Sequence, residues 1–264
     1  MERFHFTTKP FTREFRIEHR FKVEGHELEL KAFKSCVSER ASGVLISPAG
    51  CGKSVVLRAL EAELPTARNR VSYIKLNDLS ARDMCRQIAM FIGTTPCGSY
   101  PALVHAIEKR IRSGFDDEGL RQVLIIDEAH DLRPEVLRLL RLITNFDKDS
   151  RLVVSIILVG QSPLKEKLMR PDMEDIRQRM SHFGELAFLS RDETKSYIDY
   201  RCKLAGASKN PFDNQASEAI YEMARGNMRA IDELSLQSLA IADAAQRDLV
   251  DASDVALARS KRWM

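Results

Sequence analysis

Apolar runs and amphipathic segments alternate along the first 190 residues or so of the chain. Runs expected to be strands lie at 44–46, 71–76, 123–127 and 153–160, and a further strand-like run lies at 182–189. Segments with helical spacing of apolar positions lie at 27–40, 55–60, 80–93, 101–112 and 134–145. Strands that alternate with helices predict a parallel sheet covered by helices on both faces.

The pattern changes near residue 190, after which only helices are expected. They lie at 192–205, 214–225, 229–245 and 252–262. The predicted fold class is therefore α/β, a three-layer sandwich with a central parallel sheet, followed by a small all-helical lid domain. We expect an N-terminal arm at 1–24, the α/β domain at 25–190 and the helical domain at 191–264.

The arm interleaves aromatic and basic residues. Its rings are Phe4, Phe6, Phe11, Phe15 and Phe21, and its cations are Lys9, Arg13, Arg16, Arg20 and Lys22. Rings among cations are able to stack on nucleic-acid bases. They are also able to pack against their own domain or a neighbouring subunit, and we favour this second interpretation.

Composition narrows the class of protein. The 264 residues suffice for one large domain and a small satellite domain. The five cysteines form no CxxC pair, no apolar run approaches a membrane span, and the N-terminus lacks an apolar signal region, so we expect a cytoplasmic protein. The net charge is +3, so nucleic-acid binding would need local basic patches or the assembly of many copies.

The run at 44–46 leads into a glycine-containing loop that ends in Gly52-Lys53-Ser54, at the start of a helical pattern. This strand–loop–helix order is typical of a phosphate-binding P-loop, whose backbone N–H groups hold an anion. Lys53 would contact the outer phosphates and Ser54 would bind Mg²⁺. Ser47 stands where the usual pattern has glycine. The residues expected to bind ATP are Ser47, Pro48, Ala49, Gly50, Cys51, Gly52, Lys53, Ser54 and Val55.

A second motif ends the strand expected at 123–127 and continues to His130. Asp127 would hold the Mg²⁺ shell, usually through water, and Glu128 would orient and polarise the attacking water. The letters Asp-Glu-Ala-His also occur in one class of helicases. A helicase needs a second motor domain, which the helical tail is too small to supply, so we favour the ATPase interpretation.

Three further elements follow in order. Gln161, beside Ser162, ends the strand expected at 153–160 and would report the γ-phosphate, although a simple polar turn remains an alternative. Arg177 and Arg179 precede the last strand-like run, and one of them would reach the γ-phosphate in a neighbouring subunit, although both could be merely solvated. Arg229, in Gly226-Asn227-Met228-Arg229, would act as a second sensor that reaches back from the helical domain across the domain cleft.

In this order the motifs resemble an AAA+ ATPase of the ExeA/GspA-like branch, which also contains transposition helper ATPases such as MuB, TniB and TnsC. The stretches that carry the resemblance are Ser47–Ser54, Leu124–His130, Leu139–Ser150, Ile157–Leu164, Tyr197–Gly206 and Gly226–Arg229. The resemblance implies an ATPase with ATP and Mg²⁺ as cofactors, in which Lys53, Glu128, Gln161, Arg177, Arg179 and Arg229 serve catalysis.

Two functions compete within this branch. Secretion-assembly ATPases carry a transmembrane segment and a periplasmic region after the ATPase, whereas the chain ends at Met264 with neither, so we expect a transposition helper. The resemblance then implies assembly on duplex DNA as rings or filaments, recruitment or activation of a transposase, and disassembly on ATP hydrolysis. A third alternative is a nucleotide-gated scaffold with negligible turnover. Such a scaffold has no need of Glu128, of Arg177 or Arg179, or of Gln161, so these residues argue against it.

Contacts with DNA are expected after the second strand. Duplex binding needs cations that face phosphates, and its affinity falls with salt. Arg82 and Arg86 lie four residues apart on one expected helix face, although a solvated basic face remains an equal alternative. The residues that we expect to contact DNA are Lys75, Asn77, Ser80, Arg82 and Arg86.

Overall fold

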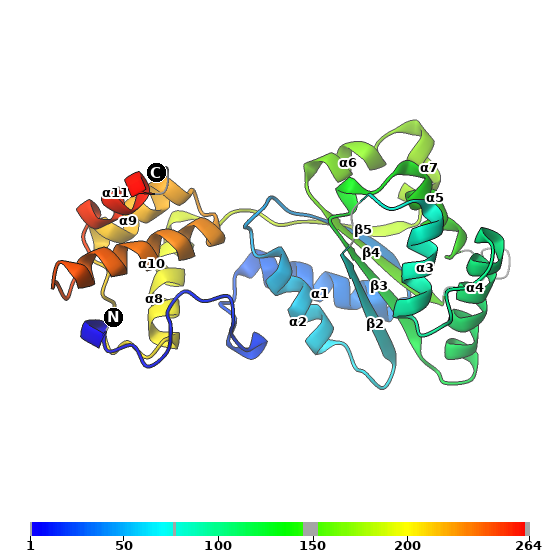
Figure 1. Ribbon diagram of the computed structural model, residues 1–264, viewed down its shortest axis with the longest axis horizontal. Helices are drawn as coiled ribbons and strands as arrows, with labels where there is room; N and C mark the ends of the chain where they lie inside the picture. Colours follow the sequence, from blue (N-terminus) through cyan, green and yellow to red (C-terminus); the bar gives the residue numbers. More distant parts are fainter. Residues whose placement is uncertain (1, 76–77, 145–152, 262–264) are drawn as a thin grey trace. The chain divides into compact units, whose positions relative to one another are not determined.

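The computed structural model describes residues 2–75, 78–144 and 153–261. Within these ranges, five parallel strands form one sheet in the order β2-β3-β4-β1-β5 (Figure 1). The strands are β1 (Ser42–Ile46), β2 (Asn69–Lys75), β3 (Arg121–Asp127), β4 (Val154–Gly160) and β5 (Met180–Glu185). Because parallel neighbours require crossover connections, helices join the strands and cover the sheet.

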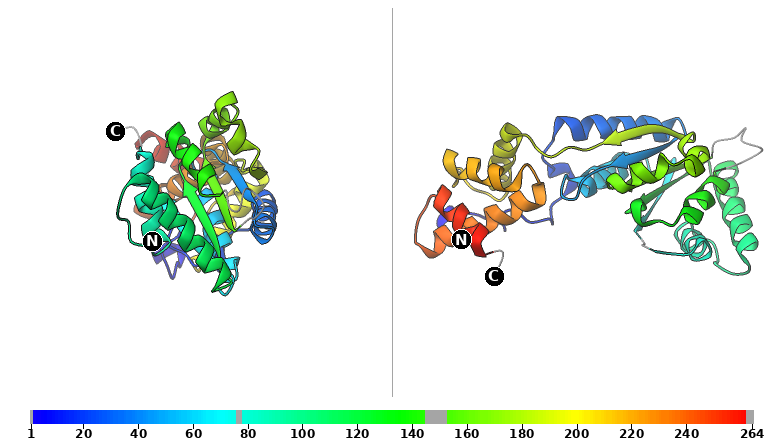
Figure 2. Two further views of the ribbon diagram at one scale, coloured as in Figure 1. Left: turned by 90° about the vertical axis from the view of Figure 1, so that its right-hand side faces the viewer. Right: turned by 90° about the horizontal axis from the view of Figure 1, so that it is seen from above.

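The helices lie on both faces of this sheet. Figures 1 and 2 show α1 and α2 on one face and α3, α4 and α5 on the other. The bounds are α1 (Glu24–Ser38), α2 (Lys53–Glu63), α3 (Ala81–Phe91), α4 (Tyr100–Asp116) and α5 (Pro134–Leu142). Shorter elements are η3 (Ala129–Asp131), α6 (Ser162–Leu168), η4 (Pro171–Met173) and α7 (Glu174–Arg177).

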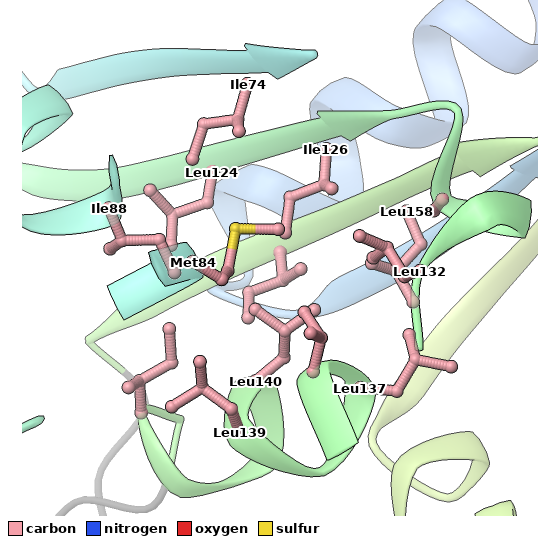
Figure 3. Close-up of a cluster of buried hydrophobic side chains, with 14 of the residues drawn as sticks. Ile74, Met84, Ile88, Leu124, Ile126, Leu132, Leu137, Leu139, Leu140 and Leu158 are labelled. Atoms are coloured by element: carbon pink, nitrogen blue, oxygen red, sulfur yellow. The ribbon is translucent and has the colours of Figure 1, made fainter. Parts of the chain in front are cut away.

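The central strands β3 and β4 are buried on both faces, which explains their nearly continuous apolar sequences. Figure 3 shows how Met84 and Ile88 of α3 and Leu140 of α5 pack over Leu124 and Ile126 of β3. Each fully buried aliphatic side chain contributes roughly 1.5–3 kcal/mol relative to its exposed state. This core fixes the strand ends at which the candidate site lies.

The prediction of a parallel α/β sandwich followed by helices is confirmed. The differences are local. Strand β5 ends at Glu185 rather than near 189, and α5 ends at Leu142. The helices α6 and α7 were not predicted, because seven and four residues are too few to display a helical period.

The helical region has its own core. It comprises α8 (Arg191–Leu204), α9 (Asn214–Ala224), α10 (Met228–Ala244) and α11 (Ala252–Lys261). Side chains cap three of these helices: Ser190 accepts from the N–H of Glu193, Asp213 from that of Ala216, and Asn227 from that of Ala230. Buried members of the core include Ile198, Ile220, Ile231, Leu239 and Val255.

The N-terminal arm, with η1 (Glu2–Phe4) and η2 (Ile17–His19), packs its rings on the helical region. The rings of Phe11 and Phe212 pack edge to face with their centroids 5.9 Å apart, and the ring centroids of Phe21 and Tyr197 are 5.4 Å apart. The prediction that these rings pack within the chain is therefore confirmed for Phe11 and Phe21. The cations Lys9, Arg13, Arg16 and Lys22 are exposed.

By their contacts the residues divide into two units. One comprises residues 27–48 and 56–186, which contain the sheet, and the other comprises 1–26, 49–55 and 187–264. The loop at 49–55 thus groups with the arm and the helical region. The predicted domain boundaries at 24 and 190 stay a prediction. Among the described residues, no helix has the length and apolar character needed to cross a membrane.

Candidate functional site

The loop that follows β1 begins at Ser47, which is fully buried. Its N–H donates to the carbonyl oxygen of Gly160 at 2.9 Å, which continues the pairing of β1 with β4. The φ angle of Ser47 lies outside the left-handed region. A side chain is therefore accommodated without backbone strain where the usual P-loop pattern has glycine.

Glycine is required at two later loop positions. Gly50 and Gly52 have φ angles of +88° and +89°. A Cβ atom on Gly50 would lie 2.1 Å from Oδ1 of Asn227, and one on Gly52 would lie 2.8 Å from Cε1 of His26. Both the backbone conformation and the lack of space therefore exclude a side chain at these positions.

The orientation of the loop peptides fits a phosphate group. Asn227 donates from Nδ2 to the carbonyl of Ala49 at 2.8 Å, and the N–H of Met228 donates to the carbonyl of Gly50 at 2.9 Å. In a trans peptide the N–H points opposite to the C=O. The N–H groups of Gly50 and Cys51 therefore point away from α10, and Lys53 and Ser54 open α2 directly afterwards. N–H groups before a helix N-terminus suit an anion.

Asp127, the last residue of β3, is a buried carboxylate held by two donors. Its Oδ1 accepts from the N–H of Glu128 at 2.8 Å, and its Oδ2 accepts from the hydroxyl of Tyr73 at 2.6 Å. Burial raises the pKa of Tyr73, and the bond to Asp127 adds to this effect, so the hydroxyl stays protonated. Mg²⁺ commonly binds one or two carboxylates together with water and substrate phosphates, so this single carboxylate suits it.

Tyr73 belongs to no motif in the sequence and was not expected at this site. The alternation of β2 places Tyr73 and Lys75 on one face of that strand, but only the pairing of β2 with β3 brings Tyr73 to Asp127. That pairing sets Lys75 opposite Asp127, and the Nζ of Lys75 lies 3.9 Å from Oε1 of Glu128. Lys75, expected to contact DNA, thus lies beside the acidic end of β3.

Glu128 departs from the strand conformation. Its φ and ψ angles are 55° and 34°, in the left-handed region, and η3 begins immediately after it. For a residue other than glycine this conformation costs roughly 1–3 kcal/mol and is most often seen at functional sites. The left-handed turn at Glu128 thus directly follows the end of β3 at Asp127.

Gln161 follows the last residue of β4 and lies beside His130. Its backbone N–H donates to Nδ1 of His130 at 3.4 Å, and its Nε2 lies 3.3 Å from Nε2 of His130. The structure therefore brings Gln161 to the segment that follows Glu128. The predicted role of Gln161 as a γ-phosphate sensor stays a prediction.

Arg177 ends α7 and Arg179 lies directly before β5. Because β5 runs parallel to β1, this position is at the amino edge of the sheet, whereas Asp127 lies at the carboxyl edge. Six strand residues span about 20 Å. Arg177 pairs with Glu174 and lowers the pKa of that carboxyl through a hydrogen bond. The predicted action of either arginine in a neighbouring subunit stays a prediction.

Arg229 is the second residue of α10 and is exposed. Gly226, which precedes this helix, has a φ angle of +76°, and a Cβ there would lie 2.0 Å from the carbonyl oxygen of Leu189. Asn227, between them, caps α10 and also contacts the loop at Ala49. The stretch thus joins the start of α10 to the loop, while the predicted role of Arg229 stays a prediction.

The other residues expected to contact DNA have partners within the chain. Ser80 caps α3, Arg82 donates to the carbonyl of Gly98 at 3.2 Å, and Arg86 pairs with Asp83 at 3.1 Å. Asn77 lies outside the described residues. Binding to DNA at this place would exchange these contacts for contacts with phosphates.

Comparison with known proteins places these features in context. Residues 36–168 match a family described as AAA domain. General secretion pathway protein A of Aeromonas hydrophila is 28% identical over 217 residues, which cover 81% of this chain and 39% of that relative. The chain therefore spans well under half the length of this relative.

Solved structures share the fold at lower identity. Cdc6p from Pyrobaculum aerophilum aligns with a TM-score of 0.74 and 17% identity over 95% of this chain and 70% of its own. The Aeropyrum pernix ORC1 protein, solved in complex with DNA, aligns with a TM-score of 0.71 and 18% identity over 97% of this chain and 69% of its own. The Holliday junction branch migration motor RuvB of Thermotoga maritima aligns with a TM-score of 0.63 and 19% identity over 95% of this chain and 72% of its own.

Proposed function

Because the chain belongs to the AAA domain family, we propose that it is a P-loop ATPase that binds ATP with Mg²⁺ and hydrolyses it. The observation that carries this proposal is the acidic pair at the end of β3. Asp127 is buried and oriented by Tyr73 and the N–H of Glu128, and Glu128 is turned out of the strand by its left-handed conformation. This arrangement supports Asp127 as a ligand for a cation and Glu128 as the residue that polarises a water molecule.

The roles follow from the charge that develops during phosphoryl transfer. The N–H groups of the loop at 47–55 and Lys53 would hold the phosphates, and Ser54 and Asp127 would hold Mg²⁺, which when bound offsets the charge on the phosphate oxygens. Glu128 would accept the proton of the attacking water. Gln161, directly after β4, and Arg229 of α10 would contact the γ-phosphate.

We propose further that the active form is a homo-oligomer, a ring or a helical filament. Arg177 and Arg179 lie at the amino edge of the sheet and so are remote from Glu128 of the same subunit. A head-to-tail arrangement would present one of them to the γ-phosphate of a neighbour. Such contacts make each site complete only after assembly.

For the cellular process, the first candidate is a secretion-assembly role. General secretion pathway protein A is 28% identical over 81% of the chain, which exceeds the 17–19% identity of the three structures compared above. In this role the ATPase cycle would act on a protein partner in the cell envelope, and DNA would have no effect.

The second candidate is ATP-dependent assembly on duplex DNA in transposition, with a transposase as partner. The motif resemblance supports it, and so do exposed cations of the arm that include Lys9, Arg13, Arg16 and Lys22. Binding through these cations would weaken steeply with salt.

The ATPase proposal and the choice between the two cellular roles can be tested in one set of measurements. ATP turnover and sedimentation are followed with ATP, a slowly hydrolysed analogue and ADP, each with and without duplex DNA. Absence of turnover in every condition would refute the ATPase proposal. Assembly promoted by duplex DNA selects the transposition role, whereas turnover and assembly indifferent to DNA select the secretion role.

A further inference from the structure

The imidazole of His130 lies between Glu128 and Gln161. Its Nδ1 is 3.5 Å from Oε2 of Glu128 and accepts from the backbone N–H of Gln161 at 3.4 Å. Its Nε2 lies 3.3 Å from the side-chain nitrogen of Gln161 and 3.6 Å from Oδ1 of Asp131. The side chain is only 14% exposed, so its position is fixed by these neighbours.

A lysine of α6 holds the backbone around His130. Lys167 of α6 donates from Nζ to the carbonyl oxygens of His130 and Leu132, both at 2.6 Å. Burial lowers the pKa of Lys167, as expected for an ammonium group directed into the protein. Since α6 begins directly after Gln161, both His130 contacts join the segment after β3 to the segment after β4.

Gly160 permits the close approach of these two segments. A Cβ at this position would lie 3.1 Å from the backbone nitrogen of His130 and 2.9 Å from Cδ2 of Leu164. The absence of a side chain at the end of β4 thus brings η3 within reach of Gln161. The last residue pair in register between the two strands is Ile126 with Leu158, so strand pairing itself does not orient Glu128 or Gln161.

A neutral imidazole accepts at one nitrogen and donates at the other. With the proton on Nε2, Nδ1 accepts from the backbone N–H of Gln161. With the proton on Nδ1, Nε2 accepts from the Gln161 amide, and the Nδ1–H lies 3.5 Å from Oε2 of Glu128. Both tautomers therefore bond the ring to the Gln161 segment, and the ring lies beside the Glu128 carboxylate.

We propose that His130 is a positioning residue that holds Gln161 in a fixed place relative to Glu128, so that the γ-phosphate contact and the attacking water are aligned together. The inference rests on the proposed ATPase function. His130 acts through its two neighbours and does not itself contact the substrate. Loss of the ring therefore misaligns the reacting groups without removing either of them.

The experiment compares turnover and ATP affinity for His130→Ala, His130→Asn and a matched control, His105→Ala, at an exposed histidine on α4. We expect His130→Ala to lower kcat about 10- to 100-fold, because small misplacements near the reacting atoms are costly. ATP affinity should change less than about threefold, since the loop contacts remain. His130→Asn, which keeps an acceptor near Nδ1, should recover part of kcat, and His105→Ala should match the unaltered chain.

Coupling to Gln161 separates positioning from general damage. If His130 acts through Gln161, His130→Ala combined with Gln161→Ala should be no slower than the slower single variant. Multiplicative losses in the double variant, or an unchanged kcat in His130→Ala, would overturn the proposal.

A second measurement needs no turnover and so separates this inference from the proposed function. Ring-nitrogen NMR of the six histidines in the full chain should show one imidazole whose signals shift in both Gln161→Ala and Glu128→Gln. No turnover together with these shifts refutes the ATPase function but supports the link through His130. Turnover without any such shift refutes the link alone.

Discussion

Two buried polar clusters, one in each unit, hold a carboxylate through different groups. In the helical region, Arg201 donates to Tyr197, Asp232 and the carbonyl of Thr12, and its guanidinium lies over the rings of Phe11 and Phe15. Asp232 is thus paired with a cation of the same chain. At the end of β3, neutral donors, the hydroxyl of Tyr73 and the N–H of Glu128, orient Asp127.

The difference separates a structural cluster from a chemical one. A carboxylate paired with a buried guanidinium stabilises the fold and has little remaining affinity for a cation. The donors from Tyr73 and Glu128 orient the Asp127 carboxylate, as outer contacts orient a metal ligand. Changes to the Arg201 cluster should therefore alter stability and spare the chemistry, and changes at the end of β3 should do the reverse.

The largest stability effect is expected for Arg201→Met. The substitution leaves Asp232 buried without its cation and removes the contact with the arm at Thr12, so the unfolding free energy of the helical region should fall by about 3–5 kcal/mol. Lys203→Met is the matched control on the same helix, because Lys203 is 67% exposed and its pair with Asp199 is worth at most about 1 kcal/mol. Denaturant unfolding followed by circular dichroism measures both, and equal losses would contradict the contrast.

Tyr73→Phe should affect the metal site more than the fold. The Asp127 carboxylate loses the hydrogen bond from the Tyr73 hydroxyl, and outer contacts of this kind change metal affinity or activity by about tenfold or more. We therefore expect the Mg²⁺ concentration for half-maximal ATP turnover to rise about tenfold. Tyr200→Phe removes a hydroxyl that donates to the carbonyl of His19 and should leave the Mg²⁺ dependence unchanged. The same shift in both variants would refute the special role of Tyr73.

The smallest effect expected is a pH dependence of stability at Asp232. Burial raises the pKa of this carboxyl to about 6, above its ordinary value of 3.8, and Arg201 opposes the rise only in part. The folded state therefore binds the proton more tightly, so this contribution to stability is present at low pH and is lost as pH rises through about 6. Relative to Asp232→Asn, the unaltered chain should lose about 1 kcal/mol between pH 5 and pH 7.5 in denaturant unfolding. A flat difference would place the carboxyl pKa near its ordinary value.

The sequence predicted the parts of this contrast that depend on local pattern. The apolar runs located the strands, and the residues after the run at 123–127 identified Asp127 and Glu128 as a pair at a strand end. Ser80, expected to open a helix, does cap α3. These features need only neighbours along the chain.

The partners of these residues lie far away in sequence. The hydrogen bond from Tyr73 to Asp127 follows from the pairing of β2 with β3, and the contact of His130 with Gln161 from the close approach of two strand ends at Gly160. Arg201 and Thr12, which are in contact, lie 189 residues apart in the sequence. The spacing of apolar residues along the sequence does not predict such contacts, because each depends on the register and packing of separate elements.

The most direct test of the central claim is the turnover of Glu128→Gln. If Glu128 accepts the proton of the attacking water, this variant should lose at least about 100-fold in kcat, since removal of a general base costs roughly 10²–10⁴-fold. It should still bind ATP within about threefold of the unaltered affinity, and Glu61→Gln, at an exposed position on α2, should keep full turnover. Full turnover in Glu128→Gln would contradict the assignment of the acidic end of β3 as the hydrolytic site.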